Sequence, residues 1–181
     1  MRFGVSVRHA AVLAMLAIGC SKVGRGDSYA RGHLLKVASL PAGAESRIYE
    51  AAIRSAFDVD PLLTLRMHPR RLARTAGDTG GDPTPGSITR SLRERGLVLG
   101  SCEPVRTSPT DTPRCSGPEA GYVIRGSDVF RISKDTVEIY FAAEKFGAST
   151  GQKPEALRFE KIYQLVGRGL AWRVVREGRV N

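Results

Sequence analysis

The chain has 181 residues, of which 41% are hydrophobic and 25% are charged, with 28 Lys and Arg against 18 Asp and Glu. This composition is typical of one globular domain with additional segments, and it excludes a collagen, a coiled coil and a protein with many membrane spans. The formal net charge is +10, but it falls to +8 without residues 1–19, which contain two arginines and no acidic residue. Because the remaining basic residues are mostly dispersed arginines, the charge alone does not indicate a nucleic-acid partner.

Residues 1–19 have the order of a secretory signal peptide. Arg2 and Arg8 precede an apolar stretch at residues 10–18, and Gly19 stands directly before Cys20. The stretch of nine apolar residues is too short to cross a bilayer. We therefore predict export and removal of residues 1–19.

The four residues Ala17-Ile18-Gly19-Cys20 resemble the lipobox of bacterial lipoproteins. The resemblance implies cleavage before Cys20, a diacylglycerol on its thiol and, because Ser21 follows, anchoring in the outer membrane. An ordinary signal peptidase would accept the same Ala-x-Gly site and cut the same bond. We expect the lipoprotein, because an unmodified Cys20 would be a free thiol in an oxidising compartment.

The other two cysteines, Cys102 and Cys115, lie in a stretch rich in Pro, Thr, Ser and Gly, without helical or strand periodicity. A bridge between them would close this loop and contribute on the order of 3 kcal/mol. A metal pair and a redox pair are the alternatives, but no histidine lies nearby and the spacing is not C-x-x-C. We predict a structural disulfide, which supports export.

The mature chain divides into a tether at residues 20–43 and a single domain at residues 44–181. The tether is polar and contains glycine, so we expect it to lift the domain off the membrane. Its brief apolar patch at Leu34, Leu35 and Val37 would alternatively form a first edge strand.

Two helices are expected in the domain. Residues 44–57 repeat apolar side chains every four positions, which predicts an amphipathic helix. Residues 87–95 predict a shorter helix, with Ser87 as its cap and Gly96 at its end.

The strand signals are strongest in the C-terminal third. Apolar residues alternate with polar ones at residues 63–67, and residues 129–132 and 137–143 predict a hairpin. Residues 157–165 and 170–174 predict a second hairpin. We predict an α+β fold, in which one long and one short helix cover an antiparallel meander sheet of four to five strands.

This ending, a tyrosine-containing strand, a Gly-Arg-Gly turn and then Trp172-Arg173-Val174-Val175, resembles the last hairpin of nuclear transport factor 2-like and cystatin-like domains. The resemblance implies a helix preceding a curved sheet, in a fold that hosts both enzymes and binding modules. It carries no functional residue over to this chain.

A basic cluster lies at residues 66–74 and contains Arg66, Arg70, Arg71, Arg74 and His68. Guanidinium groups suit phosphate or carboxylate, so the four arginines are candidates for an anion site. A solvated strand end is the alternative interpretation. Lipid head groups or envelope polyanions fit such a site better than nucleic acid, because export separates the protein from the genome and no aromatic residues interleave the cluster.

A second candidate is the row formed by Glu138, Tyr140 and Glu144, with Glu160 on the neighbouring predicted strand. Paired carboxylates could perform acid and base chemistry in a cavity. We interpret the row instead as the solvated face of an antiparallel sheet.

No histidine pair has the spacing of metal ligands, and nucleophile elbows, Walker loops and dinucleotide fingerprints are absent from the sequence. We therefore expect no metal, no cofactor and no enzymatic activity. The expected role is an exported, lipid-anchored binding or assembly module of the bacterial cell envelope, with an envelope protein or an anionic polymer as partner. Two alternatives are a small-ligand-binding or enzymatic domain with a pocket between helix and curved sheet, and a polyanion binder acting through residues 66–74.

Overall fold

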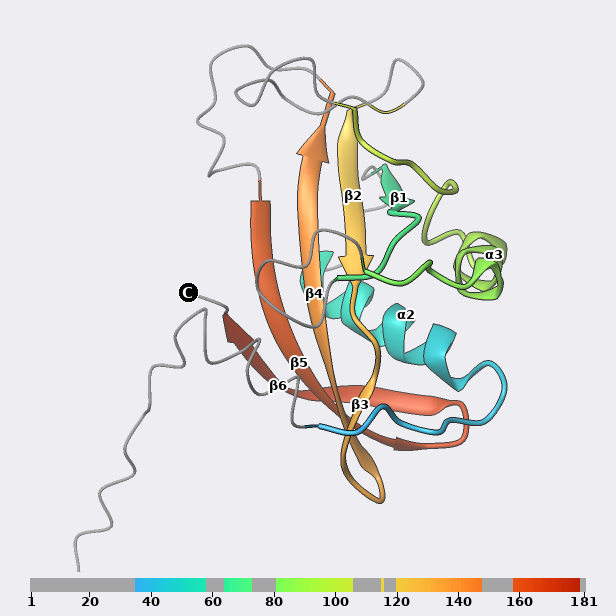
Figure 1. Cartoon of the computed structure of the whole chain (residues 1–181), viewed down its shortest axis with the longest axis vertical. Coiled ribbons are helices and arrows are strands. Elements are labelled where there is room, and N and C mark those ends of the chain that lie inside the picture. The colour runs from blue at the N-terminus through green and yellow to red at the C-terminus, as the bar shows by residue number, and fades with distance from the viewer. Residues whose placement is uncertain are drawn as a thin grey trace, which may run out of the picture.

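The computed structural model describes residues 35–57, 64–72, 81–105, 115, 120–147 and 158–179. Within these residues the chain forms two helices and a six-stranded sheet, so the predicted α+β class is confirmed (Figure 1). The elements, in chain order, are α2 (Ala44–Phe57), β1 (Leu65–Met67), α3 (Gly86–Glu94), β2 (Gly121–Gly126), β3 (Phe130–Ser133), β4 (Thr136–Phe146), β5 (Arg158–Arg168) and β6 (Ala171–Arg179).

The sheet has the order β1-β2-β4-β5-β6, and β3 pairs with β4 beside this path. All pairs are antiparallel except β1 with β2, which run parallel. The prediction of a purely antiparallel meander is wrong at this pair, because the chain between β1 and β2 passes through α3 and returns in the same direction. Sequence reasoning also missed β2, in which Val123 and Ile124 are both buried and the period of two is lost.

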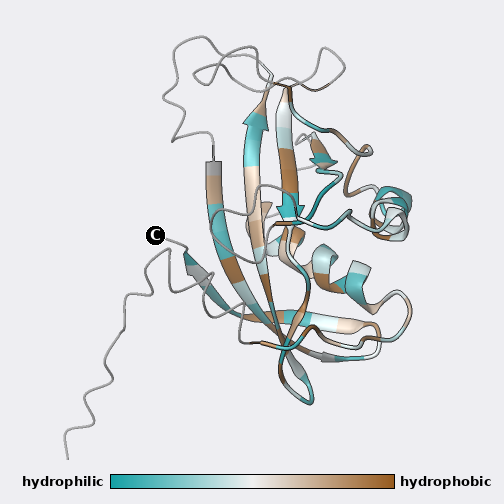
Figure 2. Ribbon diagram, in the orientation of Figure 1, coloured by the Kyte–Doolittle hydropathy of each residue, from teal (hydrophilic) through white to brown (hydrophobic). Residues whose placement is uncertain are grey.

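Helix α2 lies against one face of the sheet, and β5 and β6 bend beneath it (Figure 1). Its bounds are the predicted ones, because two apolar rows, including Ile48 and Ile53, face the sheet residues Ile124, Ile139 and Leu165. Apolar and polar residues are interleaved along the strands in Figure 2, as a sheet with a buried face requires. The amphipathic pattern therefore positions the helix that forms one wall of the site described below.

Helix α3 begins one residue before its predicted start. Pro85 occupies the cap position without a side-chain hydrogen bond, and its carbonyl accepts the N–H of Ile88 at 2.9 Å. Ser87 therefore lies inside the first turn, and the prediction that it caps the helix is wrong. Gly96 follows the helix with a φ of 69°, the left-handed conformation expected of a terminating glycine.

The end of the predicted tether runs along the domain. Val37 forms a bridge with Phe130, and the N–H of Ala38 donates to the carbonyl of Val129 at 2.7 Å. Leu40 packs against the main core. The segment thus pairs with the sheet at one bridge, which is closer to the alternative prediction of an edge strand than to a free tether.

The opposite face of the sheet carries a second, smaller core, in which Leu72 and Phe130 pack with Tyr140. Glu138 lies beside it with 0% exposure. Its carboxylate accepts hydrogen bonds from the Tyr140 hydroxyl at 3.1 Å and from the Gln164 amide at 3.0 Å. The expectation of a solvated face is wrong at these positions, because the sequence pattern of β4 does not reveal the segments that cover it.

Candidate functional site

A cleft of about 600 Å³ opens between the segment before α2, the first turn of α2 and the start of α3. This volume is within the usual range for small-molecule sites. The residues that line it are Val37, Ala38, Leu40, Pro41, Ala42, Gly43, Glu45, Ser46, Arg71, Ser87, Ile88, Ser91 and Val129.

Arg71 is the charged centre of the cleft, with 8% of its surface exposed. Its guanidinium forms ion pairs with Glu45, at 2.8 Å from Oε1, and with Asp128. Its backbone is also fixed, because its N–H donates to the carbonyl of Asp82 at 2.8 Å. A Cβ at Gly81 would overlap the carbonyl of Arg71, so the two segments approach each other as only glycine permits.

Two carboxylates share this one guanidinium, which leaves the group with one net negative charge. Burial raises the pKa of Glu45, and the neighbouring Asp128 raises it further, while Arg71 opposes both effects. Beneath them, burial strongly raises the pKa of Tyr49, whose hydroxyl donates to the carbonyl of Ser127 at 2.8 Å. Arg71 is therefore already paired with two carboxylates, of which Glu45 lines the cleft and Asp128 lies outside its lining.

The remaining lining combines hydroxyls with apolar side chains. The Ser46 hydroxyl donates to the carbonyl of Gly43 at 2.8 Å, and Ser87 and Ser91 lie on α3. Ile88 and other aliphatic residues complete the lining. The arrangement can hold a molecule that has an apolar body and a polar, donating end.

Sequence reasoning missed Glu45 and Asp128. Glu45 has the pattern of an acidic residue in a first helical turn, and Asp128 that of a turn residue between strands. No spacing links either of them to Arg71, since Asp128 is 57 residues away from it in the chain. Only the tertiary structure brings the three side chains together.

The described arginines of the predicted anion site each have different neighbours in the structure. Arg66 extends over the ring of Phe146, with its guanidinium carbon 6.0 Å from the ring centroid. Arg70 is exposed and Arg71 is paired in the cleft. Arg74 lies outside the described residues.

A second, smaller cavity of about 200 Å³ shares no lining residue with this cleft. Its lining includes four polar or charged residues, His68, Glu103, Arg125 and Glu144. The N–H of Arg70 donates to Nδ1 of His68 at 3.0 Å. Burial lowers the pKa of His68, and the positive charge of Arg125 adds to this effect, so both favour the neutral imidazole. Among the residues that the structure describes, no three His, Cys, Asp or Glu side chains are grouped as metal ligands would be.

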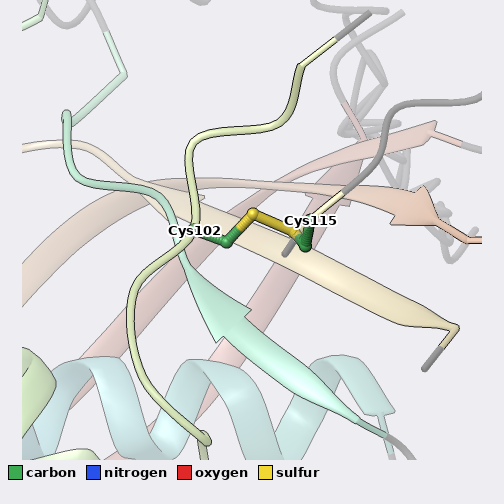
Figure 3. The surroundings of a disulfide bond; sticks show 2 residues. All are labelled: Cys102 and Cys115. Atoms are coloured by element: carbon green, nitrogen blue, oxygen red, sulfur yellow. A yellow bond between two sulfur atoms is a disulfide. The ribbon is translucent and has the colours of Figure 1, made fainter. Parts of the chain in front are cut away.

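The predicted disulfide between Cys102 and Cys115 is present, with 5.8 Å between the two Cα atoms (Figure 3). Both cysteines pack with Val123 and Phe146 beside the sheet. The bridge therefore joins two points of the connection between α3 and β2 and holds them against the sheet. Cys20, the predicted lipidation site, lies outside the described residues.

Comparison with known proteins assigns no family to the chain, because no family model, curated protein or solved structure matches it. Within the described residues, neither helix has the length and apolar character needed to cross a bilayer. The geometry of the cleft is therefore the starting point for a function.

Proposed function

We propose that this protein is an exported, lipid-anchored binding module of the bacterial cell envelope, and that the cleft around Arg71 is its binding site. The predicted signal peptide at residues 1–19, followed directly by Cys20, supports export and anchoring. The Cys102–Cys115 disulfide fits an oxidising compartment outside the cytoplasm. The single observation that carries the binding role is the 600 Å³ cleft with its buried charged centre.

The ligand class follows from the charges and the lining. Because Glu45 and Asp128 outnumber Arg71, an ammonium or hydroxyl group is favoured over a carboxylate or phosphate near the charged centre. The aliphatic side chains, among them Ile88 and Val129, suit a short apolar body. We therefore propose small amphiphiles with an amine or hydroxyl end as the ligands.

A matched pair of probes tests this proposal. Hexylammonium and hexanoate have similar apolar bodies and opposite charges, and methyl NMR of Ile88 and Val129 reports on the cleft. We expect saturable shifts of both methyl resonances with hexylammonium and none with hexanoate. Equal responses to the two probes, or no response to either, would contradict the proposed ligand class.

A variant that fills the cleft supplies the second arm of the test. Ser91 lines the cleft, whereas Arg90 on the same helix is exposed. We expect Ser91→Phe to abolish the hexylammonium response and Arg90→Phe to preserve it. If a folded Ser91→Phe protein still bound hexylammonium, the binding site would lie outside the cleft, which would contradict the proposal.

An envelope protein or an anionic polymer remains a predicted partner of the anchored domain. The geometry gives less support to a polyanion site at residues 66–74, because the guanidinium of Arg71 is already paired with Glu45 and Asp128. If the protein is retained on a heparin-like resin and loses this retention when Arg66 and Arg70 are replaced, the polyanion site is supported. If those replacements leave the retention unchanged, the polyanion site is contradicted.

A further inference from the structure

Three segments far apart in the sequence form one end of the domain, at the bottom of Figure 1. We call this end the basal surface and define it by residues 36–43, 131–135 and 168–170. Arg131 joins the first two segments, since its backbone N–H donates to the carbonyl of Lys36 and its guanidinium to that of Ser39, both at 2.9 Å.

The third segment is tied to the other two by further contacts. The Arg168 guanidinium pairs with both carboxylate oxygens of Asp135, at 2.8 and 2.7 Å. Leu170 lies so close to Gly43 that a Cβ there would be 3.6 Å from its side chain. The basal surface is therefore a continuous feature of the folded domain.

The basal surface is strongly positive. Its basic residues are Lys36, Arg131, Lys134 and Arg168, and Asp135 is the single carboxylate in the three segments, which leaves three positive charges. The guanidinium of Arg131 donates to backbone carbonyls, which do not neutralise it. The pKa of Asp135 is lowered, first by the hydrogen bond from Arg168 and also by the charges of Lys134 and Arg131.

The same surface also exposes apolar side chains. Val37 is 48% exposed, Ile132 43% and Leu170 53%. Among the described residues these are three of the six large hydrophobic side chains that are exposed. Apolar side chains among basic ones are the combination that binds the interface of an anionic membrane.

The predicted anchor, Cys20, is close to the basal surface along the sequence. Residue 35, where the described chain begins, immediately precedes the basal surface and lies 15 residues after Cys20. A chain of this length spans at most about 50 Å. A lipid on Cys20 would therefore attach to the domain at the basal surface and keep this surface within reach of the membrane.

We propose that the basal surface docks on the anionic phospholipid head groups of the membrane into which Cys20 inserts. This inference rests on the proposed lipid anchoring. It adds an orientation to the proposed function, because Val37, Leu40 and Gly43 belong both to the basal surface and to the lining of the cleft. A docked domain opens its cleft beside the bilayer, where amphiphilic ligands accumulate.

The test uses the full processed chain with Cys20→Ser, so that binding does not depend on the lipid. Co-sedimentation is measured with vesicles of phosphatidylcholine containing roughly 30% phosphatidylglycerol, an anionic fraction high enough to attract basic residues, and with phosphatidylcholine alone. We expect binding to the anionic vesicles that weakens with added salt, and little binding to the neutral ones. Equal binding to both kinds of vesicle, or to neither, would overturn the proposal.

Charge reversal locates the surface. We expect Lys36→Glu with Lys134→Glu to weaken vesicle binding by about tenfold or more, because each exposed basic residue contributes to attraction by the anionic surface. The matched control is Arg173→Glu with Arg176→Glu, two exposed positions on β6 with the same change in net charge. Equal weakening by both pairs would mean that net charge alone drives binding, and would overturn the assignment to the basal surface.

Membrane docking and the proposed function are contradicted by different results. Lipidation of Cys20 is measured by mass and ligand binding by the methyl resonances of Ile88, and neither measurement uses the vesicles. Absence of vesicle binding in a chain that binds hexylammonium would remove membrane docking and leave the cleft intact. Circular dichroism of both charge-reversal variants verifies that each is folded.

Discussion

Arg71 connects three parts of the chain at the residue scale, since its guanidinium joins its own segment to Glu45 of α2 and to Asp128 between β2 and β3. We expect Arg71→Met to lower the free energy of unfolding by about 3 kcal/mol, because it leaves two partly buried carboxylates without their cation. Urea denaturation measures the change. The control, Arg70→Met at an exposed position, should change stability by less than about 0.5 kcal/mol. Equal effects of the two variants would show that the ion pairs contribute nothing specific.

Glu50 gives a prediction about pH. Its burial opposes ionisation, yet hydrogen bonds from Arg47 and Arg54 and the charge of Arg95 outweigh it and lower the pKa of Glu50 below its usual range. The stabilisation that ionised Glu50 gives to the folded state is therefore complete above the ordinary pKa of a glutamate. It is lost as the pH falls through the lower pKa that Glu50 has in the folded state. Urea unfolding at a series of pH values between about 5 and 3 should show a smaller loss of stability in Glu50→Gln than in the wild type. Parallel curves for the two proteins would contradict the shift.

At the element scale, the disulfide closes the connection between α3 and β2. We expect Cys102→Ser with Cys115→Ser to lower the free energy of unfolding by about 3 kcal/mol, because the open chain gains loop entropy in the unfolded state. Denaturant unfolding of the processed chain measures this loss. Cys20→Ser is the control and should leave the midpoint unchanged, so a similar loss in that variant would contradict a specific role for the bridge.

The contact between α2 and β2 depends on a glycine. A Cβ at Gly126 would lie 2.5 Å from the ring of Tyr49, whose hydroxyl bonds to Ser127. Gly126→Ala should therefore lower stability by about 1–3 kcal/mol in thermal or urea unfolding, as overpacking of a core does. Gly86→Ala, where a Cβ meets nothing within 4 Å, should be close to neutral. A neutral Gly126→Ala variant would mean that Tyr49 moves aside without cost.

The elements that were predicted correctly are those whose pattern is local. The bounds of α2 followed from apolar rows with a helical period, and the β3–β4 hairpin from alternation on both sides of a turn. Strand β2 was missed because both of its faces are covered, and the parallel pairing of β1 with β2 is set by distant packing. The charged centre at Arg71 could not be predicted from the sequence either, since Glu45 and Asp128 reach Arg71 only in the folded chain.

At the scale of the whole molecule, the cleft and the basal surface share residues 37–38 and 40–43, so a ligand in the cleft and a membrane below it would meet the same segment. The exposed apolar residues of this end then have a physical reason, because lipid rather than water would cover them. The ligand class rests on the charges and the lining of the cleft. The orientation depends on a separate and central claim, that the domain works at a membrane to which Cys20 attaches it.

The intact mass of the mature protein, isolated from bacterial membranes after expression with its own N-terminus, tests this claim most directly. We predict a chain that begins at Cys20 and carries the additional mass of a diacylglycerol and its acyl chains. A protein that begins at Cys20 without lipid mass, or one that still begins at Met1, would contradict it.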